Sequence, residues 1–217
     1  MKLLILGATG RTGKLVLSTA LKQGFEVNCL ARNSNRIPSS PRLQVFEGNP
    51  GNSAELETAL KGCEYVINAL NISRTSDFPW ARLRTPATYL SEVMKTLLPL
   101  AKEYGIKGLI ICSAWGVAAT KKDIPYWFRW MIDYSNIGVA YRDHERQEEL
   151  LTNSSLAWTI VRPVGLTNSR KEEKIKVSLN NSPKPSLMIS RRSLAKFLVQ
   201  CIKEENYRGK RPVISKS

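Results

Sequence analysis

The chain has 217 residues, of which 42% are hydrophobic and 24% are charged, as in an ordinary globular protein. No apolar run is long enough to cross a bilayer, so a membrane span is excluded and we expect no membrane partner. Lys and Arg outnumber Asp and Glu by 33 to 18, which gives a net charge of +15. This excess is spread along the chain without a recognised nucleic-acid-binding motif, so it suits anionic small molecules at least as well as nucleic acid.

Length and cysteine usage narrow the class of protein further. A chain of 217 residues fits one α/β domain, and we expect a single domain over residues 1–217. The apolar start at residues 3–6 is too short for a signal peptide and runs straight into a glycine-rich loop. The four cysteines form no C-x-x-C pair, which favours reduced thiols. We therefore expect a cytoplasmic protein.

Short apolar runs alternate with longer segments of helical periodicity along the whole chain. The pattern predicts strands near residues 2–6, 26–31, 43–47, 65–69, 108–112 and 157–162, with a short final strand at 212–215. It predicts helices near residues 12–23, 53–61, 86–104 and 143–153, and a last helix after Ser190. This alternation is typical of an α/β fold, here a doubly wound Rossmann fold with a parallel sheet and helices on both faces.

A glycine-rich turn directly follows the first predicted strand. Gly7, Gly10 and Gly13 stand three residues apart in the motif GATGRTG, which opens the first helix. Glycines permit a tight turn and let backbone N–H groups approach a pyrophosphate, whose charge is then held at the positive end of the helix. In this position the motif indicates a dinucleotide site rather than a plain strand-turn-helix connection.

The end of the second strand indicates which dinucleotide binds. NAD sites usually place Asp or Glu there, on the ribose 2′-hydroxyl. This chain has no acid there and instead has Arg32 and Arg36, which could bind a 2′-phosphate through charge-assisted hydrogen bonds. We therefore expect NADP(H) as the cofactor and no metal site. The alternative is that both arginines are solvated surface residues.

Two excursions, near residues 71–85 and 114–140, interrupt the regular alternation. Both follow the carboxyl ends of predicted strands, where open parallel sheets bind ligands. Both are rich in aromatic residues: Phe78, Trp80, Trp115, Tyr126, Trp127, Phe128, Trp130 and Tyr134. These side chains could form a wall for the flat ring of a substrate, and we predict that Trp80, Trp115 or Trp127 borders the acceptor site. Alternatively, they pack on the core or on a second subunit.

The sequence resembles the atypical short-chain dehydrogenase/reductase group, whose NAD(P)H-binding members include NmrA-like proteins and biliverdin reductase B, an NADPH-dependent flavin reductase. The likeness covers the whole chain. It rests on GATGRTG at 7–13, RNSNR at 32–36, EGN at 47–49, VINAL at 66–70, CSA at 112–114, DHER at 143–146, LAWTIVRP at 156–163 and ISR at 189–191. One difference is Gly165, where the flavin reductase has a histidine, which argues against a tetrapyrrole-like substrate.

The resemblance implies how these motifs would hold NADP(H). It places the pyrophosphate against Gly7, Thr9, Gly10, Arg11, Thr12 and Gly13, and the 2′-phosphate against Arg32 and Arg36. It places the adenine side against Asn49 and Pro50, and the nicotinamide with its ribose beside Ala69, Leu70, Cys112, Ser113, Pro163 and Val164.

Three residues are candidates for acid–base chemistry. Typical short-chain dehydrogenases use Tyr-x-x-x-Lys, because the lysine lowers the pKa of the tyrosine. Tyr141 has Glu145 at that spacing, so we do not expect it to act as an acid. Ser113, at the end of the fifth strand, could hydrogen-bond a substrate carbonyl or satisfy only local backbone groups. His144 could donate a proton near neutral pH or be a surface or capping residue.

Two functions from different classes fit these residues. The first is an NADPH-dependent reductase that transfers a hydride to a flavin, quinone or similar planar acceptor, with Ser113 and His144 as candidate catalytic groups. Such a transfer asks little acid–base chemistry of the protein, so the missing Tyr/Lys pair is no obstacle. The second is a non-enzymatic NADP(H)-sensing regulator of the NmrA-like type, which explains the missing pair equally well.

Overall fold

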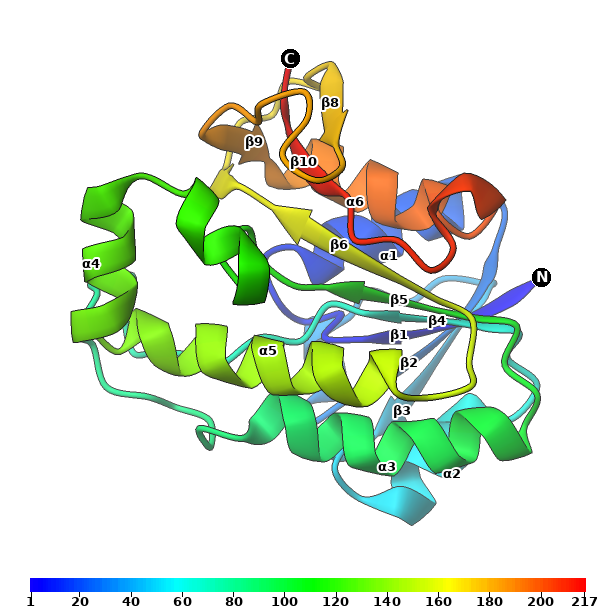
Figure 1. The fold of residues 1–217 in the computed structure, drawn as a ribbon. Helices are drawn as coiled ribbons and strands as arrows, with labels where there is room; N and C mark the ends of the chain where they lie inside the picture. The colour runs from blue at the N-terminus through cyan, green and yellow to red at the C-terminus, as the bar shows by residue number, and fades with distance from the viewer.

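A computed structural model describes residues 1–217 and shows a mostly parallel sheet with helices on both faces (Figure 1). The sheet has eight strands in the order β3-β2-β1-β4-β5-β6-β10-β8. Their bounds are β1 Lys2–Leu6, β2 Glu26–Ala31, β3 Leu43–Glu47, β4 Tyr65–Asn68, β5 Gly108–Cys112, β6 Trp158–Pro163, β8 Ile175–Ser178 and β10 Val213–Lys216. Two short strands, β7 Gly165–Thr167 and β9 Met188–Ser190, pair separately and in parallel.

The central strand β1 sets the position of the ligand crevice. It pairs with β2 on one side and with β4 on the other, both in parallel. Only β8, at the far edge, is antiparallel to its neighbour β10. Because the chain runs outward from β1 in both directions, the loops after β1 and β4 diverge at the carboxyl edge of the sheet. Open α/β sheets bind their ligands at such a switch point.

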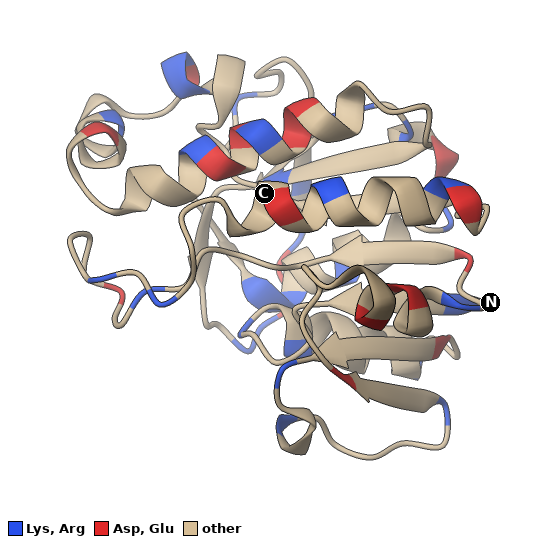
Figure 2. Ribbon diagram, turned by 90° about the horizontal axis from the view of Figure 1, so that it is seen from below, with Lys and Arg blue, Asp and Glu red and all other residues tan.

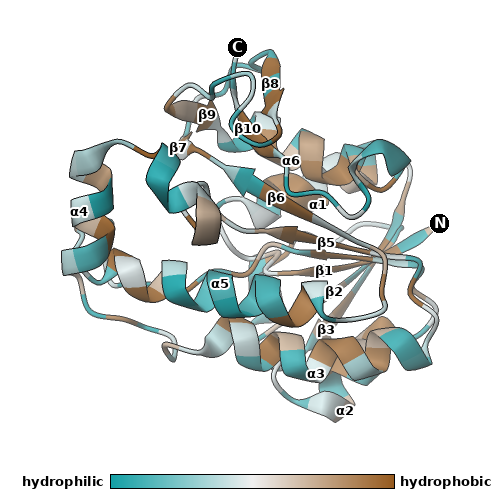
Figure 3. Ribbon diagram, viewed as in Figure 1, coloured by the Kyte–Doolittle hydropathy of each residue, from teal (hydrophilic) through white to brown (hydrophobic).

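The side chains of β1 show how the sequence builds two cores. Leu3 and Ile5 join one cluster, with α1 Gly13–Lys22 and α6 Arg191–Gln200. Leu4 and Leu6 join the other, with α2 Ser53–Leu60, α3 Tyr89–Glu103 and α5 Ile137–Thr152. Alternate side chains of a strand face opposite ways, and both faces of this sheet are covered. The strand is therefore apolar from Leu3 to Leu6, in agreement with the brown colour of the sheet centre (Figure 3).

The doubly wound fold predicted from the sequence is confirmed, and the six main strands agree with their expected bounds to within one residue. Two helices begin elsewhere than expected, and three short strands are additional. Helix α3 begins at Tyr89 instead of residue 86, and α5 begins at Ile137 instead of residue 143. Strands β7, β8 and β9 were not expected, because segments of three or four residues give too little periodicity to detect.

The second excursion contains a helix of its own, α4 Tyr126–Tyr134, which leads into α5 at a tight junction (Figure 1). Gly138, in the first turn of α5, explains the close approach. A Cβ atom at this position would lie 2.0 Å from the carbonyl oxygen of Ile132 in α4. Gly138 is therefore the residue that lets the two helices meet.

Charged residues are distributed over the whole molecule. Figure 2 shows Lys and Arg on most helices and several loops, with Asp and Glu interspersed. This arrangement agrees with the spread of basic residues along the chain. No helix in the structure combines the length and apolar character that crossing a membrane requires.

Candidate dinucleotide site

A cleft of about 610 Å³ opens at the carboxyl edge of the sheet, over the switch point. Its lining comes from the loops that follow β1, β2, β3 and β4, from Tyr89 at the start of α3, from Leu166 in β7 and from Arg191 at the start of α6. Ten of the residues predicted to bind cofactor line it: Gly7, Thr9, Gly10, Arg11, Thr12, Arg32, Arg36, Pro50, Ala69 and Leu70. The structure thus brings together the pyrophosphate and 2′-phosphate parts of the expected site.

Backbone geometry explains the glycines of the first loop. Gly7 has a φ of +84°, and a Cβ there would lie 2.8 Å from the backbone of Ala69. A Cβ on Gly13 would lie 2.0 Å from the carbonyl oxygen of Gly7. Gly13 does not line the cleft; it lets the first turn of α1 pack against the loop. The close packing therefore requires glycine at both positions. Without side chains there, the backbone N–H groups at the start of α1 stay accessible to an anion.

Arg32 and Arg36 lie in the cleft with no competing partner. Both are exposed, and neither makes a hydrogen bond or ion pair within the chain. The intervening turn is fixed by Asn33, whose side chain accepts from Asn35 N at 3.1 Å. Glu47, the acid at the end of β3, accepts from the Ser34 hydroxyl at 2.6 Å. The two guanidinium groups are therefore free to bind a phosphate.

Sequence reasoning missed an arginine cluster on the other side of the glycine loop. Arg11 donates to both carboxylate oxygens of Asp77, at 2.7 and 2.8 Å, across 66 residues of chain. Arg74, Arg84 and Arg191 line the same cleft. Asp77 is the single acid among the lining residues, against six arginines. The basic residues of the first excursion were a signal for this cluster, but their convergence on Arg11 depends on the fold.

Besides Gly13, five residues that the resemblance assigns to the cofactor do not line this cleft. Asn49 accepts from Gly51 N at 3.1 Å and so shapes the turn before α2. Pro163 and Val164 are buried at the end of β6. Cys112 is half-buried against the core, and burial raises the pKa of its thiol to about 12. Ser113 is buried as well. Of the expected nicotinamide contacts, Ala69 and Leu70 line the cleft, and the contacts to Cys112, Ser113, Pro163 and Val164 stay predictions.

The hydroxyl of Ser113 is engaged in a buried network instead of facing the cleft. It donates to Glu148 Oε1 at 2.5 Å, and the side chain is 4% exposed. Glu148 also accepts from two nitrogens of Arg162: Nε, at 3.0 Å from Oε1, and Nη2, which donates to Oε2. Ser113 thus has a structural partner, which corrects the expectation that its hydroxyl is free to contact a substrate carbonyl. A charged residue inside the apolar strand β6 was the sequence signal for this network.

His144 lies on α5, is 3% exposed and does not line the cleft. Burial lowers the pKa of its imidazole from 6.5 to about 4. Its Nδ1 has no hydrogen-bond partner. The ring is therefore uncharged at neutral pH, which corrects the expectation that His144 delivers a proton there.

The pKa of this histidine can be tested directly, because His144 is the only histidine of the chain. We expect the NMR signals of its ring to show no titration between about pH 8 and pH 5. The unfolded chain binds a proton at about pH 6.5 and the folded chain only near 4, so stability should fall as the pH decreases through this window. A midpoint near 6.5 in the folded protein would restore His144 as a candidate acid.

Tyr141 is also removed from acid–base chemistry by its surroundings. Its hydroxyl lies 3.4 Å from the carbonyl oxygen of Trp115, and its ring packs edge-on against Phe128. Burial raises the pKa of the phenol well above its ordinary value. A tyrosine in this state does not ionise near neutral pH, in agreement with the absence of a lysine four residues later.

The two aromatic excursions meet at one end of the molecule. Trp80 Nε1 donates to the carbonyl oxygen of Tyr134 at 2.8 Å. Four rings contact one another in series. The ring centroids are 5.4 Å apart for Phe78 and Trp80, 6.3 Å for Trp80 and Trp130, and 5.6 Å for Trp130 and Tyr134. We call these four residues the aromatic edge; all are exposed, from 45% to 67%. Trp115 is different, because it is 4% exposed and belongs to the core.

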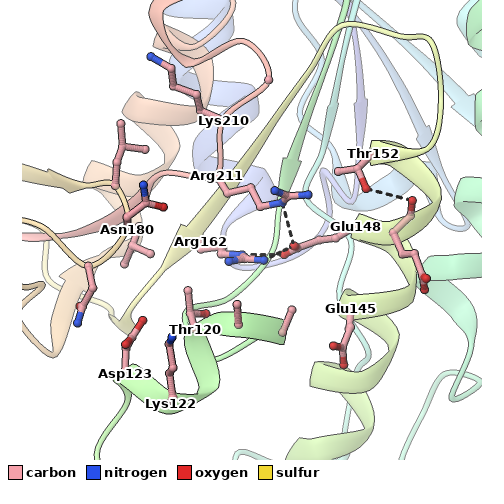
Figure 4. Close-up of a pocket in the computed structure, with 17 residues that line it drawn as sticks. Thr120, Lys122, Asp123, Glu145, Glu148, Thr152, Arg162, Asn180, Lys210 and Arg211 are labelled. Atoms are coloured by element: carbon pink, nitrogen blue, oxygen red, sulfur yellow. Dashed lines mark hydrogen bonds and ion pairs between the residues drawn. The ribbon is translucent and has the colours of Figure 1, made fainter.

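A second cavity of about 1070 Å³ lies beyond the Ser113 network, between α5 and the β8–β10 edge (Figure 4). Glu148 and Arg162 line it, and Arg211 reaches Glu148 Oε2 at 3.9 Å from the rim. Its other lining charges are Lys122, Asp123, Glu145, Glu149 and Lys210. Positive and negative groups are thus equal in number in this cavity, in contrast to the arginine-rich cleft.

The fold and the cleft together define a class of protein. A glycine loop between β1 and α1 lies at the switch point of a doubly wound sheet, and arginines occupy the place where NAD sites have an acid. These are the features of a dinucleotide-binding Rossmann protein.

Comparison with known proteins makes this class specific. Residues 7–205 match the NAD(P)H-binding family, and the chain belongs to that family. An oxidoreductase from Pestalotiopsis microspora is 27% identical in an alignment of 178 residues that covers 75% of this chain. The match spans 66% of that relative, just under two thirds of its length.

Two solved structures are similar in fold over nearly the whole chain. A short-chain dehydrogenase/reductase from Veillonella parvula, determined in complex with NADP, has a TM-score of 0.80 at 19% identity, with 99% of this chain and 94% of that one covered. The anaerobillin reductase ChuY from Escherichia coli O157:H7 has a TM-score of 0.80 at 17% identity, with 100% and 97% covered. At these identities the likeness concerns the fold.

Proposed function

We propose that this chain is an NADPH-dependent reductase that transfers a hydride to a flavin, a quinone or a similar planar acceptor. The observation that carries the cofactor half of the proposal is the pair of unpartnered arginines, Arg32 and Arg36, beside a loop that requires glycine at positions 7 and 13. This arrangement fits a pyrophosphate and a 2′-phosphate. When bound, the nicotinamide supplies the hydride, and the chain supplies binding and orientation.

The acceptor half of the proposal rests on the state of three residues considered for acid–base chemistry. Ser113 is held by Glu148, His144 is uncharged, and the pKa of Tyr141 is raised. No side chain of these three offers a proton at neutral pH. Hydride transfer to a flavin or quinone can proceed with a proton from water, whereas carbonyl reduction usually uses a positioned acid. The proposed acceptors are therefore those that need least acid catalysis.

A panel of acceptors tests the proposal. Oxidation of NADPH is followed by its absorbance with flavins, quinones and aldehydes at equal concentrations. We expect turnover with flavins or quinones and none above background with aldehydes. Turnover confined to aldehydes, or an equal rate with NADH, would contradict the proposal.

The aromatic edge is proposed as one wall of the acceptor site, since Phe78 directly follows Asp77 of the cleft. Loss of one aromatic contact costs about 0.5–1.5 kcal/mol, so Trp80→Leu should raise the acceptor KM about two- to tenfold. The matched control is Trp127→Leu, another exposed tryptophan, on α4, whose ring lies tilted against Phe128 instead of belonging to the aromatic edge. An unchanged KM in a folded Trp80→Leu variant would assign the edge to another role.

The second candidate function is the non-enzymatic NADP(H) sensor. The observation that favours it is the exposure of the aromatic edge, with Trp130 at 48% and Tyr134 at 67%, which would suit a protein partner. The acceptor panel distinguishes the two functions. Tight NADPH binding without turnover of any acceptor is the result expected of a sensor.

A further inference from the structure

Three arginines from separate parts of the chain surround one aspartate in the cleft. Arg11 belongs to the glycine loop, Arg74 to the loop after β4, and Arg191 is the first residue of α6. Asp77 accepts two hydrogen bonds from Arg11. These hydrogen bonds lower the pKa of Asp77, and the positive charges of the three arginines lower it further. We call Arg11, Arg74 and Arg191 the arginine triad.

Arg191 is held in place by bonds that do not involve Asp77. Arg191 Nη1 donates to Asn168 Oδ1 at 2.7 Å and to the carbonyl oxygen of Leu166 at 3.3 Å. The backbone at Arg74 forms a bridge with Leu83 that closes its loop. Burial and, after it, the positive charge of Arg11 lower the pKa of Arg191. A cluster of like positive charges favours the binding of an anion.

The carboxylate of Asp77 is bound only weakly by this cluster. Its side chain is 77% exposed, and that of Arg11 is 58% exposed. Ion pairs between exposed side chains contribute only about 0–1 kcal/mol, so a stronger anion can displace the carboxylate at little cost.

The charge of the whole cleft leaves room for such an anion. Its six arginines and single aspartate give a surplus of five positive charges. A 2′-phosphate carries about −1.5 to −2 charges, and the two phosphodiester groups of a pyrophosphate add about −2. At least one positive charge therefore stays uncompensated when NADPH is bound.

We propose that the arginine triad binds a phosphate or carboxylate group of the acceptor, and that Asp77 holds the site as an internal anion until the acceptor displaces it. This inference rests on the proposed function and narrows its substrate to anionic planar molecules. A flavin 5′-phosphate (FMN) fits the site, whereas riboflavin has the same ring without the anion.

Binding to the NADP⁺ complex tests the proposal without turnover. Kd values for FMN and riboflavin are measured by quenching of flavin fluorescence in saturating NADP⁺. We expect FMN to bind at least about tenfold more tightly than riboflavin, since one charge-assisted hydrogen bond contributes about 1.5–3 kcal/mol. Arg191→Gln should remove most of this preference, and Asp77→Asn should tighten FMN binding while leaving riboflavin unchanged.

The control is Arg192→Gln, which removes the same charge from the next residue of α6, outside the cleft. Equal Kd values for FMN and riboflavin, or equal effects of the two arginine variants, would overturn the proposal. So would an Arg191→Gln variant that weakens NADP⁺ binding but keeps the FMN preference, since the triad would then serve the cofactor pyrophosphate. A triad-dependent FMN preference without NADPH oxidation would instead contradict only the reductase function.

Discussion

Replacement of both Arg32 and Arg36 by alanine is expected to raise the Kd for NADPH at least about a hundredfold and to leave the Kd for NADH within about threefold. Both guanidinium groups are exposed and lack partners in the chain. A charge-assisted hydrogen bond contributes about 1.5–3 kcal/mol, and two such bonds to one phosphate suffice for a hundredfold even after screening by solvent. The wild-type chain should accordingly bind NADPH at least about tenfold more tightly than NADH.

Isothermal titration calorimetry at two salt concentrations checks this expectation. The preference for NADPH should shrink at high ionic strength, because exposed charges are screened there. The matched control is Arg146→Ala, which removes an exposed arginine from α5 outside the cleft. Equal affinities of the wild-type chain for both cofactors, or equal losses for both in the double variant, would contradict the assignment.

The phosphate half of the site could be predicted because its determinants are local in sequence. The glycine loop and the arginines that follow β2 each occupy a few consecutive residues, and their place follows from the order of strands and helices. The alternation of apolar strands and amphipathic helices likewise specifies the fold, since each strand is covered on both faces.

The catalytic half could not be predicted because it depends on the direction of single side chains. Ser113 follows a strand whose end the sequence placed well, yet its hydroxyl contacts Glu148. His144 was expected at the start of a helix, but α5 begins at Ile137, so the residue lies inside the helix and is buried. Successive residues of a strand point to opposite faces, so a position alone does not tell which group a side chain meets. The Arg11–Asp77 pair is hidden for another reason: its members are 66 residues apart and both lie in loops.

Glu148→Gln is expected to destabilise the fold by about 3–5 kcal/mol, as is usual when one partner of a buried ion pair is removed. Glu148 and Arg162 are 4% and 5% exposed, and Glu148 also accepts from Ser113. The amide would leave the Arg162 charge uncompensated in the interior. In a chain of this size such a loss lowers Tm by about 6–20 °C, measured by thermal unfolding.

Three further variants distinguish the effect of the buried charge on stability from the effect of losing one polar contact. Glu149→Gln, the same change on the exposed neighbour in α5, should leave Tm within about 2 °C of the wild type. Ser113→Ala should cost about 1–3 kcal/mol, because it removes one hydrogen bond but no charge. The double variant Glu148→Gln with Arg162→Gln should recover part of the loss, since it removes the orphaned charge as well. A Glu148→Gln variant as stable as Glu149→Gln would mean that solvent from the adjacent cavity, or Arg211 at its rim, already compensates this pair.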